Sequence, residues 1–195
     1  MKILICGVGS LGSNLAALLA CDLKGEHEIT VLDFDKVAER NLMGTQYYFP
    51  GQEEQLKSEA LEYSIYKHFN REINIITEKL TTSNAVKILS NYNLIIDAFD
   101  NYESRSIVQS FHLNYGSGEV LHLGLSNQMT FEISWAENYQ VPTDITSGFD
   151  ICEMEGASSF VKLVASLGSL VIQQYLKNGS KREFVGSALT IREIK

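Results

Sequence analysis

The glycine-rich segment CGVGSLGSN, residues 6–14, constrains the fold of this chain more than any other feature. An apolar segment typical of a strand precedes it, and the small apolar residues LAALLA, typical of a helix, follow it. Gly7, Gly9 and Gly12 form the pattern GxGxxG. The first glycine permits a tight turn, the second lets the backbone approach a phosphate, and the third lets the helix pack against the strand. The segment therefore predicts a nucleotide-binding strand–turn–helix unit, with the phosphate at the helix N-terminus.

A carboxylate follows at the end of the next predicted strand. Asp33 comes directly after the apolar residues 28–32. In a dinucleotide-binding unit an acidic side chain at this spacing, roughly twenty residues after the glycines, bonds the ribose hydroxyls. The alternative is a glycine-rich turn that binds nothing. The pattern by itself does not distinguish NAD from ATP.

Apolar segments of strand length alternate with segments of helical spacing through the first two thirds of the chain. We expect buried parallel strands at 3–5, 28–32, 73–77, 93–98 and 119–123, and helices at 11–23, 53–69, 83–92 and 103–115. Such an order predicts an α/β fold, a Rossmann-like doubly wound sheet with mostly parallel strands.

The last third of the chain has a different pattern. Residues 129–135 alternate apolar and polar side chains, as a half-exposed antiparallel strand does. Residues 136–157 lack a clear period and predict a long surface loop, which in a compact domain is often functional. A strongly apolar helix is expected at 158–176 and a closing edge strand at 188–194. We expect one domain spanning residues 1–195.

Composition excludes several classes of protein. The 195 residues suffice for one domain with a core, and the net charge of −8, without a basic stripe, argues against nucleic acid as a partner. No segment is expected to span a membrane. Cys6, Cys21 and Cys152 are odd in number and form no CxxC pair, so neither a disulfide framework nor a structural zinc site is expected. These features predict a cytoplasmic protein, in which His122 is a hydrogen-bonded core residue.

Several further segments follow the glycine turn in a specific order. They are DFDKVAERNLMGTQYYF at 33–49, Lys57, DAFDNYESR at 97–105, NQMTFEI at 127–133 and SLGSLVIQQYL at 166–176. In this order the chain resembles the ThiF/MoeB/HesA superfamily, which includes the ubiquitin-activating enzymes. The resemblance covers nearly the whole chain.

The resemblance implies an ATP-dependent adenylyltransferase. Members of the family use ATP and Mg²⁺ to adenylate the C-terminal carboxylate of a ubiquitin-like or sulfur-carrier protein, and pyrophosphate leaves. It also implies a homodimer, or a heterodimer with a homologue. Its implied site comprises the three glycines around the nucleotide, Asp33 on the ribose, Asn41 and Gln46 on phosphate or adenosine, Lys57 on phosphate, Asp100 on Mg²⁺ and Asn101 beside the reacting phosphate. Such residues suit a reaction between two anions, which depends on positioning and charge neutralisation.

Several charged residues in these segments also have a plainer interpretation. Lys57 is alternatively a solvated charge on a helix, and Asp100 is alternatively the cap of the helix that follows it. Asp97 is the alternative metal ligand. Arg105 is alternatively a residue that only stabilises its own helix, and Asp35 is expected to shape its loop rather than to contact a ligand.

The chain departs from the family pattern at an arginine-containing motif, and it lacks the zinc-binding CxxC pairs of many members. The family motif NLxRQ supplies an arginine to the phosphates, whereas this chain has NLMGTQ at 41–46. Arg40 is the nearest substitute, and we expect it to point elsewhere. Cys152 lies where some members carry a thioester-forming cysteine. We favour an inert role for it, because no His or Lys adjoins it to lower its pKa.

Two other functions therefore remain open beside adenylation. The missing arginine permits a non-catalytic scaffold that binds a ubiquitin-like protein or pairs with an active homologue. The glycine turn and Asp33 permit an NAD-dependent oxidoreductase, which we rank last because the chain is short for a separate substrate domain.

Overall fold

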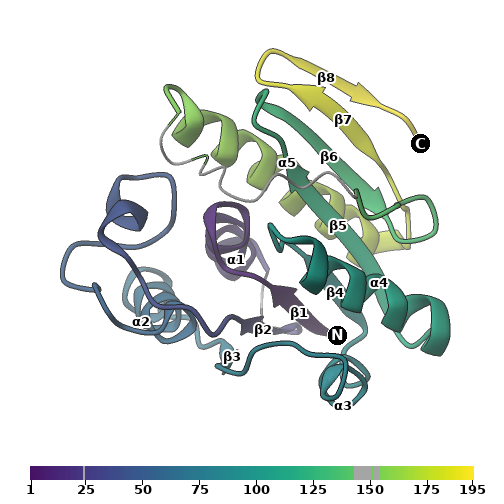
Figure 1. The fold of residues 1–195 in the computed structure, drawn as a ribbon, viewed down its shortest axis with the longest axis horizontal. Helices are drawn as coiled ribbons and strands as arrows, with labels where there is room; N and C mark the ends of the chain where they lie inside the picture. Colours follow the sequence, from purple (N-terminus) through teal and green to yellow (C-terminus); the bar gives the residue numbers. More distant parts are fainter. Residues whose placement is uncertain (24, 143–150, 152–153) are drawn as a thin grey trace.

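A single eight-stranded sheet runs through the protein, with helices on both of its faces (Figure 1). The computed structural model describes residues 1–23, 25–142, 151 and 154–195. Along the chain the elements are β1 (Lys2–Cys6), α1 (Ser10–Asp22), β2 (Glu28–Leu32), the 3-10 helix η1 (Glu39–Leu42), α2 (Lys57–Phe69), β3 (Asn74–Ile76), α3 (Ala85–Leu89), β4 (Leu94–Asp97), α4 (Tyr102–Tyr115), β5 (Glu119–Leu125), β6 (Thr130–Trp135), α5 (Ala157–Asn178), β7 (Phe184–Ser187) and β8 (Thr190–Glu193).

The order of the strands confirms the predicted fold class. It is β3-β2-β1-β4-β5-β6-β7-β8, in which the first five strands are parallel and β6, β7 and β8 are joined antiparallel. The parallel strands β1 and β4 are almost wholly buried, as expected where helices cover both faces. The direction of winding reverses between β1 and β4, which is where open α/β sheets bind their ligands.

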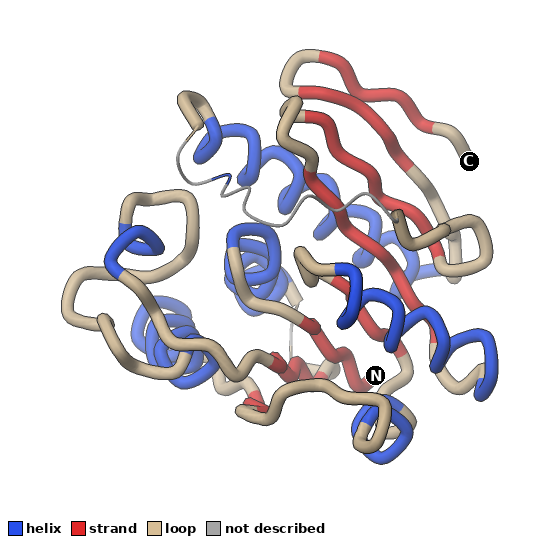
Figure 2. The backbone as a smooth tube through the Cα atoms, viewed as in Figure 1, coloured by secondary structure: helices blue, strands red, loops and turns tan. Residues whose placement is uncertain are grey.

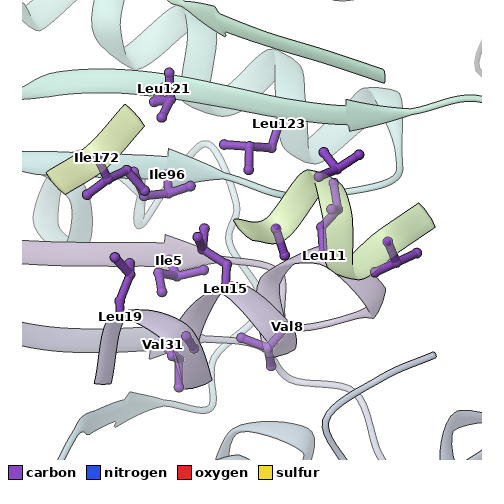
Figure 3. Packing of buried hydrophobic residues seen from close by; sticks show 14 of the residues in the cluster. Ile5, Val8, Leu11, Leu15, Leu19, Val31, Ile96, Leu121, Leu123 and Ile172 are labelled. Carbon is purple, nitrogen blue, oxygen red and sulfur yellow. The ribbon is translucent and has the colours of Figure 1, made fainter. Parts of the chain in front are cut away.

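Two apolar cores lie on the two faces of the sheet. The larger one joins α1, α2 and α5 to the sheet, and the smaller one joins α3 and α4 to the opposite face. Leu15 of α1, Ile5 of β1 and Ile172 of α5 belong to the larger core (Figure 3). Ile95 and Val108 belong to the opposite core. Successive residues of one strand thus pack against helices on opposite faces of the sheet, as Ile95 and Ile96 of β4 do, and this fixes the register of the central strands.

Helix α5 corrects one expectation from the sequence. By length and composition it is apolar enough to cross a membrane, and it is the one such helix in the part of the chain that the structure describes. Its residues Phe160, Val164 and Ile172 are buried in the larger core, beside α1. A central core helix passes the same test of length and composition, which explains the difference.

Several element boundaries also differ from those expected. Helix α2 begins at Lys57 instead of residue 53, because the preceding residues form turns held by the buried side chain of Gln52, whose amide donates to the Ala60 carbonyl at 2.8 Å. Helix α3 is shorter than predicted. Strand β7 is not predicted from the sequence, since its short segment FVGS lacks a clear alternation. The predicted strand at 188–194 contains β8. The described parts of the 136–157 loop contain no strand.

Candidate nucleotide-binding site

A cavity of about 1100 Å³ lies at the carboxyl ends of β1, β2, β4 and β5, at the reversal of the sheet. Residues far apart in the sequence meet there. The predicted site residues that line it are Gly7, Gly9, Asp33, Asn41, Gln46, Lys57, Asp100 and Asn101. Gly12 is not among its lining residues, and Cys152 lies outside the described residues. The structure brings these residues together, and their contacts with a nucleotide stay predictions.

The glycine turn has the geometry that the sequence predicts. Gly7 has a φ of +82°, and a side chain there would also meet Phe99, at 3.0 Å from the added Cβ. At Gly12 an added Cβ would lie 1.9 Å from the carbonyl oxygen of Gly7, so only glycine allows α1 to approach the turn. The N-terminus of α1, at Ser10, opens on the cavity. The positive end of the helix dipole therefore faces the site, where an anion is favoured.

Asp33 links the glycine turn to the second strand. One carboxylate oxygen accepts a hydrogen bond from the Val8 amide at 2.9 Å, and the other accepts one from the Asp35 amide at 2.8 Å. Burial raises the pKa of Asp33, although the Lys57 ammonium and the two amides oppose this. Each oxygen keeps a second lone pair, so the carboxylate can hold the turn and also accept from a ribose hydroxyl.

The long segment between β2 and α2 (Figure 2) is held by side-chain hydrogen bonds to the glycine turn and to α1. The buried Tyr48 hydroxyl donates to the Val8 carbonyl at 2.7 Å. The Asn14 amide of α1 donates to the Thr45 carbonyl at 2.8 Å. These buried bonds place Gln46, between them in the sequence, at the wall of the cavity. No local pattern predicts these bonds, since Asn14 and Tyr48 have the sequence context of ordinary helix and loop residues.

We expect Tyr48→Phe to lower the free energy of unfolding by about 1–2 kcal/mol, because the buried Val8 carbonyl loses its hydroxyl donor. Urea unfolding measures the change. Tyr63→Phe on the exposed part of α2 is the matched control, with an expected change near zero. Equal effects of the two substitutions would contradict a fastening role for Tyr48.

Lys57 is not the solvated surface charge of the plainer interpretation. Its side chain is 13% exposed, and its ammonium lies 3.5 Å from the Asp35 carboxylate. Its backbone amide donates to the Asp35 carbonyl at 2.8 Å, which fixes the start of α2 at the cavity. Asp35 therefore shapes its loop, as expected, and also orients the lysine. The result is a cation held beside the glycine turn.

Asp97 and Asp100 lie in very different surroundings. Asp97 is fully buried and accepts a hydrogen bond from His122 at 2.7 Å. Burial alone would raise its pKa, but the Arg105 guanidinium and His122 outweigh this and hold the pKa below its usual range. His122 also contacts Gln109 at 2.9 Å, which confirms it as a hydrogen-bonded core residue. Asp97 does not line the cavity, and its carboxylate is engaged by His122 and Arg105, which favours Asp100 over Asp97 as the metal ligand.

Asp100, by contrast, is exposed at the cavity. The cap of α4 is Asn101, whose side-chain oxygen accepts from the Ser104 amide at 2.9 Å. The alternative that Asp100 caps this helix is therefore wrong. Among the described residues no group of three or more His, Cys, Asp or Glu side chains could hold a metal ion. Mg²⁺ in nucleotide sites takes one or two carboxylates and completes its shell with phosphates and water, and Asp100 fits that use.

Arg105 does more than stabilise its own helix, which corrects the plainer interpretation. Its guanidinium donates to the Tyr139 hydroxyl at 2.8 Å and to the Leu123 carbonyl at 2.9 Å, and lies 3.9 Å from the Asp97 carboxylate. Burial alone would lower the pKa of Arg105, but the Asp97 carboxylate and Tyr139 outweigh burial, so the pKa is raised. A buried, permanently charged cation thus reaches the cavity wall.

Arg40 also lines the cavity, so the expectation that it points elsewhere is wrong. It lies on η1 beside Asn41, whose side-chain oxygen accepts from the Ala38 amide at 2.8 Å. That bond holds the side chain of Asn41, and both residues line the cavity. A 3-10 turn, which the sequence did not predict, decides this placement.

The sequence is similar to several curated proteins. It is 32% identical over 129 residues to adenylyltransferase and sulfurtransferase UBA4 of Saccharomyces cerevisiae, covering 65% of this chain and 29% of UBA4. It is 34% identical over 136 residues to adenylyltransferase and sulfurtransferase MOCS3 of Arabidopsis thaliana, covering 66% and 28%. Molybdopterin-synthase adenylyltransferase of Haemophilus influenzae is 31% identical over 107 residues, covering 54% and 43%. The matched region thus spans less than half of each relative.

The fold is similar to solved structures at low sequence identity. Escherichia coli MccB, solved with ATP, has a TM-score of 0.78 at 15% identity, covering 98% of this chain and 62% of MccB. PaaA has a TM-score of 0.74 at 16% identity, covering 100% and 63%. At such identity the likeness establishes the shared Rossmann-like fold alone. The sequence itself matches the ThiF family over residues 1–191, and the chain belongs to that family.

Proposed function

We propose that this chain adenylates the C-terminal carboxylate of a ubiquitin-like or sulfur-carrier protein with ATP. The observation that carries the proposal is the single cavity in which the glycine turn, Lys57, Asp100 and Asn101 meet. The names of its relatives, which are adenylyltransferases, support it. The solved complex of MccB with ATP supports ATP as the nucleotide.

In this proposal the residues of the chain bind and neutralise the phosphates. The N-terminus of α1 and the Lys57 ammonium attract the triphosphate, and Asp33 accepts from the ribose. Asp100 would hold Mg²⁺, which when bound supplies further neutralisation of phosphate charge. An oxygen of the substrate carboxylate forms a bond to the α-phosphorus, the bond from that phosphorus to its bridging oxygen breaks, and pyrophosphate leaves with that oxygen.

In this chain two other arginines take over the positive charge that the arginine of the family motif NLxRQ supplies to the phosphates. Arg40 lines the cavity beside Asn41, next to the position of the missing motif arginine. Arg105 lies deeper, where its guanidinium donates to Tyr139 and Leu123 and lies 3.9 Å from the Asp97 carboxylate, and it brings positive charge to the cavity wall. These cations support catalysis by the chain over the scaffold alternative, since two anions must approach each other in the reaction.

Calorimetric titration with ATP and Mg²⁺, and in parallel with NAD, tests the choice of nucleotide. We expect ATP to bind and NAD not to bind. Lys57→Met should weaken ATP binding about tenfold through loss of a charge-assisted contact. Lys67→Met, on an exposed residue of the same helix, is the matched control. Binding of NAD in place of ATP would contradict the proposal and favour the oxidoreductase.

The scaffold alternative is tested by turnover. Pyrophosphate release with candidate carrier proteins supports the enzyme. The scaffold is favoured if the chain binds ATP and forms a stable carrier complex but releases no pyrophosphate. The absence of the motif arginine from NLMGTQ at 41–46 motivates this alternative.

A further inference from the structure

The cavity continues past the nucleotide residues onto strands β5, β6 and β7. Its lining on this side is formed by Gly124, Ser126, Thr130, Glu132, Val185 and Gly186. Tyr139 and Pro142, from the segment after β6, also line it. A ligand that starts at the glycine turn can therefore extend across the antiparallel strands without leaving the cavity.

Glu132 is the carboxylate among these lining residues of β5, β6 and β7. In the register of the sheet it lies between Gly124 of β5 and Val185 of β7. Directly opposed residues of neighbouring antiparallel strands point to the same face. Because Gly124 has no side chain, β5 leaves room beside Glu132 for groups from other elements. The guanidinium of Arg105 lies over that floor, 3.6 Å from where a Cβ of Gly124 would be.

The carboxylate of Glu132 is only partly satisfied by the protein. It accepts one hydrogen bond from the neutral Ser134 hydroxyl at 2.6 Å. No ion pair in the described part of the chain includes it. Arg105, the nearby cation, donates to Tyr139 and Leu123 instead. A half-buried anion with a single neutral donor gains most from a cation brought by a ligand.

From this geometry we infer that Glu132 selects a basic side chain, lysine or arginine, near the C-terminus of the polypeptide that the chain activates. The inference rests on the proposed function, because it places the terminal carboxylate toward the phosphates. Three strand spacings separate β1, which precedes the glycine turn, from β6, which carries Glu132. Neighbouring strands lie about 4.8 Å apart and an extended peptide spans about 3.3 Å per residue, so about four residues cover this distance. We therefore place the basic side chain among the last four residues.

Affinity selection from a library of seven-residue peptides with free C-termini, randomised at the last four positions, tests the inference by binding alone. We expect the wild type with ATP to enrich lysine or arginine at one of these positions about tenfold, as one charge pair of this kind contributes. Glu132→Gln keeps the shape of the side chain and the bond to Ser134, and it should lose the enrichment. Glu132→Lys should enrich acidic residues instead. Glu78→Gln, on an exposed glutamate outside the cavity, should behave as the wild type.

The same enrichment in Glu132→Gln as in the wild type would overturn the inference, and so would the absence of basic enrichment in the wild type. Pyrophosphate release is measured in parallel on the selected peptides. Release without a basic preference overturns this inference and leaves the proposed function standing. A basic preference that depends on Glu132, without pyrophosphate release, supports recognition of a basic side chain by Glu132 and contradicts adenylation.

Discussion

Asp97→Asn should destabilise the protein by about 3 kcal/mol at neutral pH, the cost expected when one partner of a buried charge pair is removed. The substitution leaves the buried Arg105 guanidinium without its anion, which lies 3.9 Å away in the native protein. It also replaces the charged acceptor of His122 with a neutral amide. The loss is larger than that of an ordinary hydrogen bond because both partners are fully or nearly fully buried.

This destabilisation should depend on pH in a definite direction. The pKa of Asp97 is lowered in the folded protein, against burial, by Arg105 and His122. Its contribution to stability is therefore complete above the pKa of the unfolded chain, about 3.9, and is lost as the pH falls through the lower pKa of the folded protein. The difference in the free energy of unfolding between wild type and Asp97→Asn should accordingly shrink below about pH 4.

Urea unfolding at several pH values measures both effects. Asp100→Asn is the matched control, since it makes the same change at an exposed carboxylate three residues later, and its stability should stay within about 0.5 kcal/mol of the wild type. Arg105→Met should also destabilise. The double variant should lose less than the sum of the two single losses if the residues are coupled. Strict additivity would contradict the charge pair.

The parallel half of the fold was predictable because each signal there is local. The strands β1, β2 and β4 are continuous apolar segments between helical ones, and the glycine turn sits between the first strand and its helix. The antiparallel end was harder. Strand β7 has only four residues, including a glycine and a serine, and it owes its strand conformation to pairing with β6 and β8. Pairing between distant segments leaves little trace in a short sequence.

The candidate site shows the same division. The glycine turn and Asp33 follow from spacing, because a strand, a tight turn and a helix fix their positions. The buried partners of Arg105 could not be predicted from spacing, because Tyr139 lies 34 residues later in the sequence and reaches Arg105 only in the folded chain. The placement of Arg40 depends on the 3-10 helix η1. Lys57 lies at the cavity because the residues before it form turns, so that α2 begins only at Lys57. Tertiary contacts, rather than local pattern, decide these three cations.

Asp100→Asn should lower the rate of carrier-dependent pyrophosphate release by about 10²–10³-fold, because charge stabilisation at a reacting phosphate is lost with the carboxylate that would hold Mg²⁺. Binding of ATP should weaken far less, since the glycine turn and Lys57 remain. The effect on the rate is larger than the effect on ATP affinity, because charge neutralisation matters most while the substrate carboxylate and the triphosphate react.

The measurement is pyrophosphate release at saturating ATP, with the affinity for ATP determined separately by calorimetry. Glu103→Gln is the matched control, since Glu103 is exposed in the first turn of α4 and its carboxylate lies 3.6 Å from the Lys79 ammonium outside the cavity. Its rate should stay within about twofold of the wild type, as expected for an exposed ion pair. An unchanged rate in Asp100→Asn would contradict its role as metal ligand. An equal loss in both variants would show that the negative charge at this end of α4 matters, whichever carboxylate carries it.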